Sequence, residues 1–174
     1  AGAPASELGT RIDVYQRMVF PLVDMQGDVL HGRVIHIDRY GNLNSTVIGP
    51  YSTPSTRLPG AGGAPEIAAH ARQTFVMLKA TPRSFVPQLN FRTSAGYLDG
   101  HGARARSGAR GGGPRAVITD FGMLTPAVGS EELELSALFE GATVDAARAA
   151  VGWSLLVAPN VTTLAAPTET ELTT

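Results

Sequence analysis

Cysteine is absent from all 174 residues of the chain. Its absence excludes disulfides, cysteine metal ligands and thiolate catalysis, and it is typical of a cytoplasmic protein. Apolar runs are short, and none approaches the roughly 20 residues that a membrane-spanning helix requires. The formal net charge of −1 gives the surface no strong field of one sign. We therefore expect neither a nucleic acid nor a membrane as a partner.

The length predicts a single domain over residues 1–174 with a substantial core. Strand and helix signals alternate along the chain, which favours the α/β class. With 20 glycines and 12 prolines, many turns and loops are expected. The chain begins with neither methionine nor a signal-like segment, so a processed product and a fragment both stay open as explanations.

Apolar runs and alternation predict the strands, and capping residues predict the helices. The expected strands are 34–37, 47–48, 74–78 (buried), 116–119, 133–138 (half-buried) and 153–157. One helix is expected at 65–72, where Pro65 suits the first turn. Another is expected at 144–151, capped by Thr143 and ended by Gly152. The segment 96–115 has few apolar residues and is expected to be a surface excursion.

A glycine cluster, Gly60, Gly62 and Gly63, precedes the first predicted helix. Its unencumbered backbone N–H groups can bind a phosphate or an oxyanion. The alternative is a tight loop that needs glycine for its own backbone dihedrals. The spacing does not fit a dinucleotide-binding fingerprint, because no strand runs directly into the cluster.

Arginines gather in a second glycine-rich stretch: Arg104, Arg106, Arg110 and Arg115. Such a loop can clamp the phosphates of a charged cofactor, or it can be a solvated surface loop. Binding of RNA would need interleaved aromatic residues, and the stretch 100–115 contains none.

No metal site and no catalytic residue can be assigned from the sequence. His36 and Asp38 share one face of a predicted strand, but His31 lies beyond a glycine and no third ligand is in view. The chain has no Gly-x-Ser-x-Gly elbow and no convincing pair of catalytic carboxylates.

Several blocks of sequence occur in a fixed order: 37–49 (IDRYGNLNSTVIG), 57–68 (RLPGAGGAPEIA), 91–100 (FRTSAGYLDG), 117–122 (VITDFG) and 141–153 (GATVDAARAAVGW). In this order and spacing they resemble the B subunit of family I CoA-transferases, in the glutaconate and 3-oxoacid branch. The resemblance runs from about Ile37 to Glu171, whereas residues 1–36 are atypical.

The resemblance implies a Rossmann-like open sheet of the CoA-transferase type with an incomplete N-terminal half. It implies coenzyme A or acyl-CoA as substrate without a metal, and an A subunit as partner, with a dimer of heterodimers as a possible assembly. A half-length unit of this kind leaves one face of its sheet uncovered, so an exposed apolar face is expected, buried by a partner chain or a second copy.

The family moves CoA between carboxylic acids through a glutamyl-CoA thioester. On that model Gly60, Gly62 and Gly63 line the CoA-thioester pocket, Asn42 and Asn44 shape the turn beneath it, and Arg104 and Arg106 contact CoA. The family's nucleophilic glutamate usually lies in a Glu-Ser-Gly or Glu-Asn-Gly turn, and this chain contains neither. A CoA-thioester (ring-opening) hydrolase subunit and a non-catalytic partner-binding scaffold are the alternatives.

Overall fold

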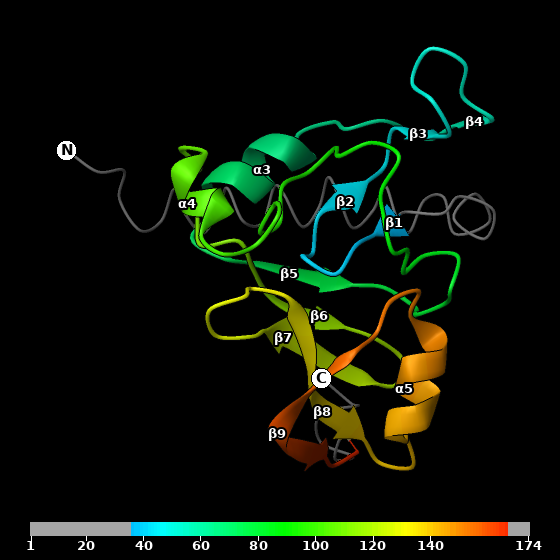
Figure 1. The fold of residues 1–174 in the computed structure, drawn as a ribbon, viewed down its shortest axis with the longest axis vertical. Helices are drawn as coiled ribbons and strands as arrows, with labels where there is room; N and C mark the ends of the chain where they lie inside the picture. The colour runs from blue at the N-terminus through cyan, green and yellow to red at the C-terminus, as the bar shows by residue number, and fades with distance from the viewer. Residues whose placement is uncertain (1–35, 167–174) are drawn as a thin grey trace, which may run out of the picture. The chain divides into compact units, whose positions relative to one another are not determined.

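The computed structural model describes residues 36–166 (Figure 1). Within this range lie one five-stranded sheet, two two-stranded sheets and three short helices. No helix among these residues is long and apolar enough to cross a membrane. His31 and the start of the strand expected at 34–37 lie outside the described residues, and the single domain expected over 1–174 stays a prediction.

The five-stranded sheet is mixed and has the order β5-β6-β7-β8-β9. Its strands are β5 (Thr74–Met77), β6 (Pro114–Ile118), β7 (Gly122–Pro126), β8 (Leu133–Phe139) and β9 (Leu156–Leu164). The outer pairs β5-β6 and β8-β9 are parallel, whereas β6-β7 and β7-β8 are antiparallel. An open sheet with helices in the connections confirms the expected α/β class.

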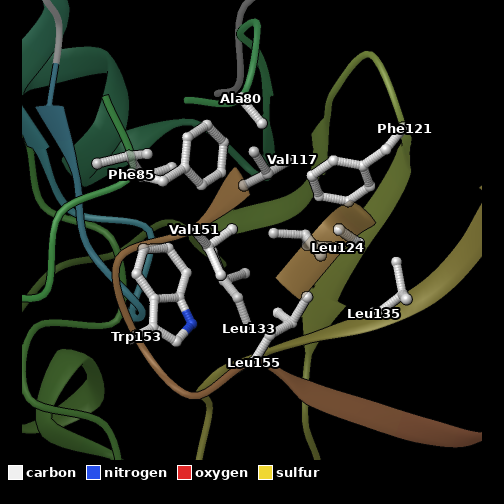
Figure 2. Close-up of a cluster of buried hydrophobic side chains, with 12 residues drawn as sticks. Ala80, Phe85, Val117, Phe121, Leu124, Leu133, Leu135, Val151, Trp153 and Leu155 are labelled. Carbon is white, nitrogen blue, oxygen red and sulfur yellow. The ribbon is translucent and has the colours of Figure 1, made fainter. Parts of the chain in front are cut away.

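The core lies on one face of this sheet (Figure 2). Strand β8 alternates as expected: Leu133, Leu135 and Ala137 are buried, and the residues between them are partly exposed. The rings of Phe85 and Trp153 stack with centroids 5.9 Å apart. Residues from the connections therefore complete a core that the strands begin.

Helix α5 (Val144–Ala150) covers this core through Ala147. The hydroxyl of Thr143 accepts a hydrogen bond from the N–H of Ala146 at 3.2 Å, which confirms the predicted cap. Gly152 lies just after the helix, and close packing also requires a glycine at this position. A Cβ there would lie 2.6 Å from the carbonyl oxygen of Phe85.

Strand β5 is not the buried strand that its apolar run predicts. It forms one edge of the sheet and, among the described strands, pairs only with β6. Val76 packs against the core, whereas Phe75 and Met77 are 59% and 64% exposed. The apolar run therefore serves two faces, and one of them is uncovered within residues 36–166. Phe75 and Met77 are exposed as such a face would require, and an uncovered face over the whole sheet stays a prediction.

The last strand also differs from its prediction. Trp153 and Leu155 are buried core residues in an irregular segment, and β9 begins only at Leu156 and continues to Leu164. Strand β7 was not predicted, because Gly122 and Pro126 bound it and obscure its short pattern. Strand β6 extends the expected 116–119 to begin at Pro114.

The segment 96–115 is only in part the expected surface excursion: residues 105–112 are mostly exposed, whereas buried residues on either side of this stretch anchor it. It contains the short helix α4 (Ala103–Arg106), in which Arg104 is only 3% exposed. Its glycines permit close backbone contact: a Cβ at Gly96 would lie 2.3 Å from the carbonyl oxygen of Tyr40, and one at Gly111 would lie 2.1 Å from that of Ala71. In this segment the backbones pack directly against one another at the glycines, without apolar side chains between them.

Candidate functional site

A tight turn follows strand β1 (His36–Ile37) and leads into β2 (Leu43–Asn44). Gly41 adopts φ +68° in this turn, and its N–H donates to the carbonyl oxygen of Asp38 at 3.0 Å. The Asp38 carboxylate accepts bonds from the backbone N–H groups of Tyr40 and Asn42, both at 3.0 Å. Burial raises the pKa of Asp38, and the hydrogen bonds from Asn42 oppose that shift.

Asn42 and Asn44 are fully buried and hold backbone segments in place. The Asn42 oxygen accepts from the N–H groups of Gly96 at 2.8 Å and Leu98 at 3.0 Å. The Asn44 amide donates to the carbonyl oxygen of Val47 at 2.6 Å. Both side chains therefore shape turns, and neither presents a free polar atom to a ligand.

Backbone hydrogen bonds connect the loop that carries the glycine cluster to the segment that follows Asn44. Leu58 N–H donates to the carbonyl oxygen of Thr46 at 3.0 Å, and Gly60 N–H donates to that of Ser45 at 2.8 Å. The hydroxyls of Thr46 and Thr93 lie 2.7 Å apart. Thr93 was missed by sequence reasoning, because a partner 47 positions away leaves no local pattern.

Beyond Gly60 the loop offers backbone donors to its surroundings. Within residues 36–166, the N–H groups of Ala61, Gly62 and Gly63 have no acceptor. Gly60 and Gly62 need glycine for their φ angles of +101° and +50°. Gly63 does not, since its φ is −87°, and a Cβ there would meet no described atom within 4 Å. Neither the backbone conformation at position 63 nor the packing around it within residues 36–166 explains why this residue is glycine.

Helix α3 (Ala64–His70) follows the cluster and has Pro65 in its first turn, which confirms the predicted helix. Glu66 is the carboxylate nearest in sequence to these N–H groups, but its side chain is 82% exposed and lies 3.5 Å from the His70 ring. Other carboxylates have structural partners: Asp120 accepts from the N–H of Ala80 at 2.8 Å, and Glu131 accepts from that of Gly102 at 2.7 Å.

The two arginines predicted to contact CoA occupy different environments. The Arg104 guanidinium points inward and donates to the carbonyl oxygens of residues 68, 69, 95, 96 and 111. Burial lowers its pKa. Arg106 is exposed, and it donates to the carbonyl oxygen of His101 at 2.7 Å. Of the two, Arg106 alone lies where an external anion can reach it.

A surface pocket of about 300 Å³ opens beside the 38–42 turn. Asp38, Tyr40 and Arg92 line it, and Arg92 also pairs with Asp99 at 2.8 Å. Sequence reasoning did not find this pocket, because its walls come from segments about 50 residues apart. No group of three histidine or acidic side chains in the described part of the chain is arranged to hold a metal ion.

The family model and two curated relatives agree on one family. The family model described as Coenzyme A transferase matches residues 34–150. The chain is 46% identical to the B subunit of the 3-oxoadipate CoA-transferase of Pseudomonas knackmussii over 136 residues, which are 78% of this chain and 52% of that protein. It is also 46% identical to the B subunit of the glutaconate CoA-transferase of Acidaminococcus fermentans over 89 residues, which are 51% of this chain and 33% of that protein.

The fold agrees with these sequence matches. The crystal structure of glutaconate coenzyme A-transferase from Acidaminococcus fermentans aligns with a TM-score of 0.73 and 35% identity, covering 80% of this chain and 54% of that one. The sheet is therefore of the type that the resemblance implied. The chain spans about half the length of the curated relatives it matches, or less.

Proposed function

The chain belongs to the coenzyme A transferase family, and from that premise we propose that it forms part of an enzyme that moves CoA between carboxylic acids. In the proposed reaction a glutamate carboxylate attacks the acyl-CoA carbonyl and expels the CoA thiolate, which leaves a mixed anhydride. The thiolate then attacks the glutamyl carbonyl of the anhydride, releases the donor acid and forms the glutamyl-CoA thioester. An acceptor acid takes CoA from this thioester by the same steps in reverse. The relatives that are named as B subunits of CoA-transferases support this proposal.

The N–H groups of Ala61, Gly62 and Gly63, which have no acceptor within residues 36–166, are the observation that carries the proposal. Attack on a thioester places negative charge on the carbonyl oxygen, and backbone donors fixed in advance stabilise that oxyanion. The bonds that hold Gly60 and Leu58 to the 45–46 segment keep the donors in place. Gly63 lacks a side chain because, in this proposal, substrate passes directly over it.

We place the nucleophile outside this part of the chain. Glu66 is the carboxylate nearest in sequence to the glycine cluster, and its exposed side chain faces His70 rather than a closed pocket. An A subunit is the proposed partner, in a dimer of heterodimers, and a cytoplasmic location and independence from metal ions remain predictions. Arg106 is the proposed contact for a CoA phosphate, and Arg104 acts by holding the backbone behind the loop.

Gly63→Val tests the role of the glycine cluster in the full chain assembled with an A subunit. A φ of −87° is open to L-residues and a Cβ at this position meets no described atom within 4 Å, so assembly and thermal stability should be retained. Valine keeps the backbone N–H of residue 63, but its side chain blocks the approach of the thioester to it. We therefore expect kcat to fall by about a hundredfold or more, as when an oxyanion donor is lost.

Gly129→Ala is a control elsewhere on the surface: Gly129 also faces open space, in the turn between β7 and β8, but its φ of +89° favours glycine. Its activity should stay within about twofold of the parent, since a strained surface glycine costs stability rather than turnover. Unchanged turnover in Gly63→Val would contradict the assignment of the glycine cluster to oxyanion binding.

A hydrolase on the same scaffold differs in what discharges the thioester. Mass spectrometry of peptides after incubation with acyl-CoA locates a CoA adduct on a glutamate. Discharge of that adduct only by an added carboxylic acid supports a transferase, whereas discharge by water supports a hydrolase. Absence of any adduct in the assembled complex favours a non-catalytic scaffold and contradicts the proposal.

A further inference from the structure

The glycine cluster has few contacts of its own to hold it in place. A Cβ added at any of its three glycines would meet no described atom within 4 Å, so nothing described packs against them on that side. Before them, the side chain of Leu58 is buried, and Pro59 has no N–H to donate. The N–H groups of Leu58 and Gly60 therefore fix the start of the loop, and the direction of the N–H groups at 61–63 depends on the segment that accepts those two bonds.

That accepting segment is residues 45–46. The carbonyl oxygen of Thr46 accepts from the N–H of Leu58 at 3.0 Å, and that of Ser45 accepts from the N–H of Gly60 at 2.8 Å. The Oδ1 atom of Asn44 accepts from the N–H of Thr46 at 3.0 Å and from the next N–H along the chain at 3.3 Å. Asn44 therefore fixes the two peptide groups that carry these carbonyls, but it leaves the N–H of Ser45 to another acceptor.

Thr93 is that acceptor, and it comes from a distant part of the sequence. Its hydroxyl oxygen accepts from the N–H of Ser45 at 2.9 Å and lies 2.7 Å from the hydroxyl of Thr46, with which it forms a hydrogen bond. The backbone of Thr93 is itself fixed on β2, because its N–H donates to the carbonyl oxygen of Leu43 at 2.8 Å. Leu43 and Ser94 also exchange two bonds of 3.0 Å. Thr93 therefore connects a paired strand to the segment that holds the loop.

We infer that Thr93 is a positioning residue for the oxyanion donors. Its hydroxyl holds residues 45–46, and through the bonds from Leu58 and Gly60 that segment sets where the N–H groups of 61–63 point. This role rests on the proposed function, in which those N–H groups receive the carbonyl oxygen of the thioester. Thr93 itself does not touch the substrate. Oxyanion donors act only at the correct distance and direction, and a shift of about 1 Å caused by a change remote from the chemistry can cost about a hundredfold in rate.

Thr93→Val removes the hydroxyl and keeps a branched side chain of similar shape, so the N–H of Ser45 loses its described acceptor. The test uses the full chain assembled with an A subunit, with acetyl-CoA as the varied substrate and succinate in excess. We expect kcat to fall about tenfold to a hundredfold. The KM for acetyl-CoA should change by less than about twofold, because the hydroxyl does not contact substrate. Thr93→Ser keeps the hydroxyl and should restore kcat to within about threefold of the parent.

Hydrogen exchange measures the placement of the loop without any activity. In Thr93→Val the N–H groups of Leu58 and Gly60 should exchange at least about tenfold faster than in the parent, because their bonds open locally more often. Thr93→Ser should return them to the parent rate. Thr143→Val is the matched control, since it removes the hydroxyl that caps α5 through a bond of 3.2 Å outside this network. It should lower Tm by about 2–4 °C and leave kcat and these exchange rates unchanged.

Three results would overturn the inference. Unchanged exchange in the loop of Thr93→Val would mean that Asn44 alone holds the segment. A lower Tm with unchanged kcat per assembled complex, as in Thr143→Val, would give Thr93 a purely structural role. A loss of kcat that Thr93→Ser does not restore would assign the effect to side-chain volume. If Gly63→Val leaves turnover unchanged, the proposed function fails, whereas the exchange rates still decide whether Thr93 places the loop.

Discussion

Replacing Arg104 tests whether this residue, which the sequence assigned to ligand binding, has a structural role instead. Arg104→Met keeps a long apolar side chain and removes the guanidinium, which is bonded to the carbonyl oxygens of Ala95, Gly96 and Gly111 among others. Among described donors, these three carbonyls have no other partner.

The size of the effect follows from those three carbonyls. Leaving a buried acceptor unsatisfied costs about 1–3 kcal/mol. Since two of the three hydrogen bonds are only partly buried, we take the low end for each, and the variant loses about 3 kcal/mol of unfolding free energy. For a chain of this size 1 kcal/mol shifts Tm by about 2–4 °C, so Tm should fall by about 6–12 °C. Arg104→Lys should recover less than half of the loss, because an ammonium cannot reproduce the planar fork.

Thermal unfolding followed by circular dichroism measures the fall in Tm. Urea unfolding then shows that the m-value is unchanged. Arg106→Met is the matched control on the same helix. It is exposed, with one bond to the carbonyl of His101, and its Tm should move by less than about 2 °C. Equal shifts in the two variants, or a shift under about 2 °C for Arg104→Met, would refute the reasoning.

Two further predictions concern pH and substrate binding. Burial lowers the pKa of His36 below 6.5, so below that pH the unfolded chain binds more protons and the unfolding free energy falls as the pH drops. In urea titrations, His36→Gln should reduce the dependence of the unfolding free energy on pH between pH 5 and 7. An unchanged dependence would mean that a group other than His36 causes it. In the assembled enzyme Arg106→Ala should raise the KM for CoA esters about two- to fivefold with kcat unchanged. Arg148→Ala, an exposed arginine on α5, is its control, and equal KM values would rule out Arg106 as a contact.

Local chemistry was enough to predict the regular parts of the fold. Alternation in 133–138 identified β8, Thr143 identified the start of α5, and Pro65 marked the first turn of α3. Each signal depends only on residues within a few positions, so sequence carries it directly. The Gly41-Asn42 dipeptide likewise predicted a turn, and Gly41 takes the positive φ expected of it.

The misassigned parts share a different cause. Strand β5 was expected to be buried because its run is apolar, but whether a strand lies inside a sheet or at its edge depends on which strands pair with it. Arg104 was expected near solvent because its neighbours are glycines. Those glycines instead let backbones approach closely, and the guanidinium satisfies the carbonyls that this approach buries.

By itself, the sequence determined the α/β class, the helices α3 and α5, strand β8 and the family to which the chain belongs, because periodicity, caps and ordered blocks depend on neighbouring residues. Only the tertiary structure decided which polar groups have hydrogen-bond partners and which have none within the described residues. Asn42 and Arg104 have their polar atoms engaged by segments far away in the chain, whereas the N–H groups of 61–63 and the edge of β5 have no partner in residues 36–166. Hydrogen-bond partners are a property of three-dimensional neighbours, and residue types alone do not specify them.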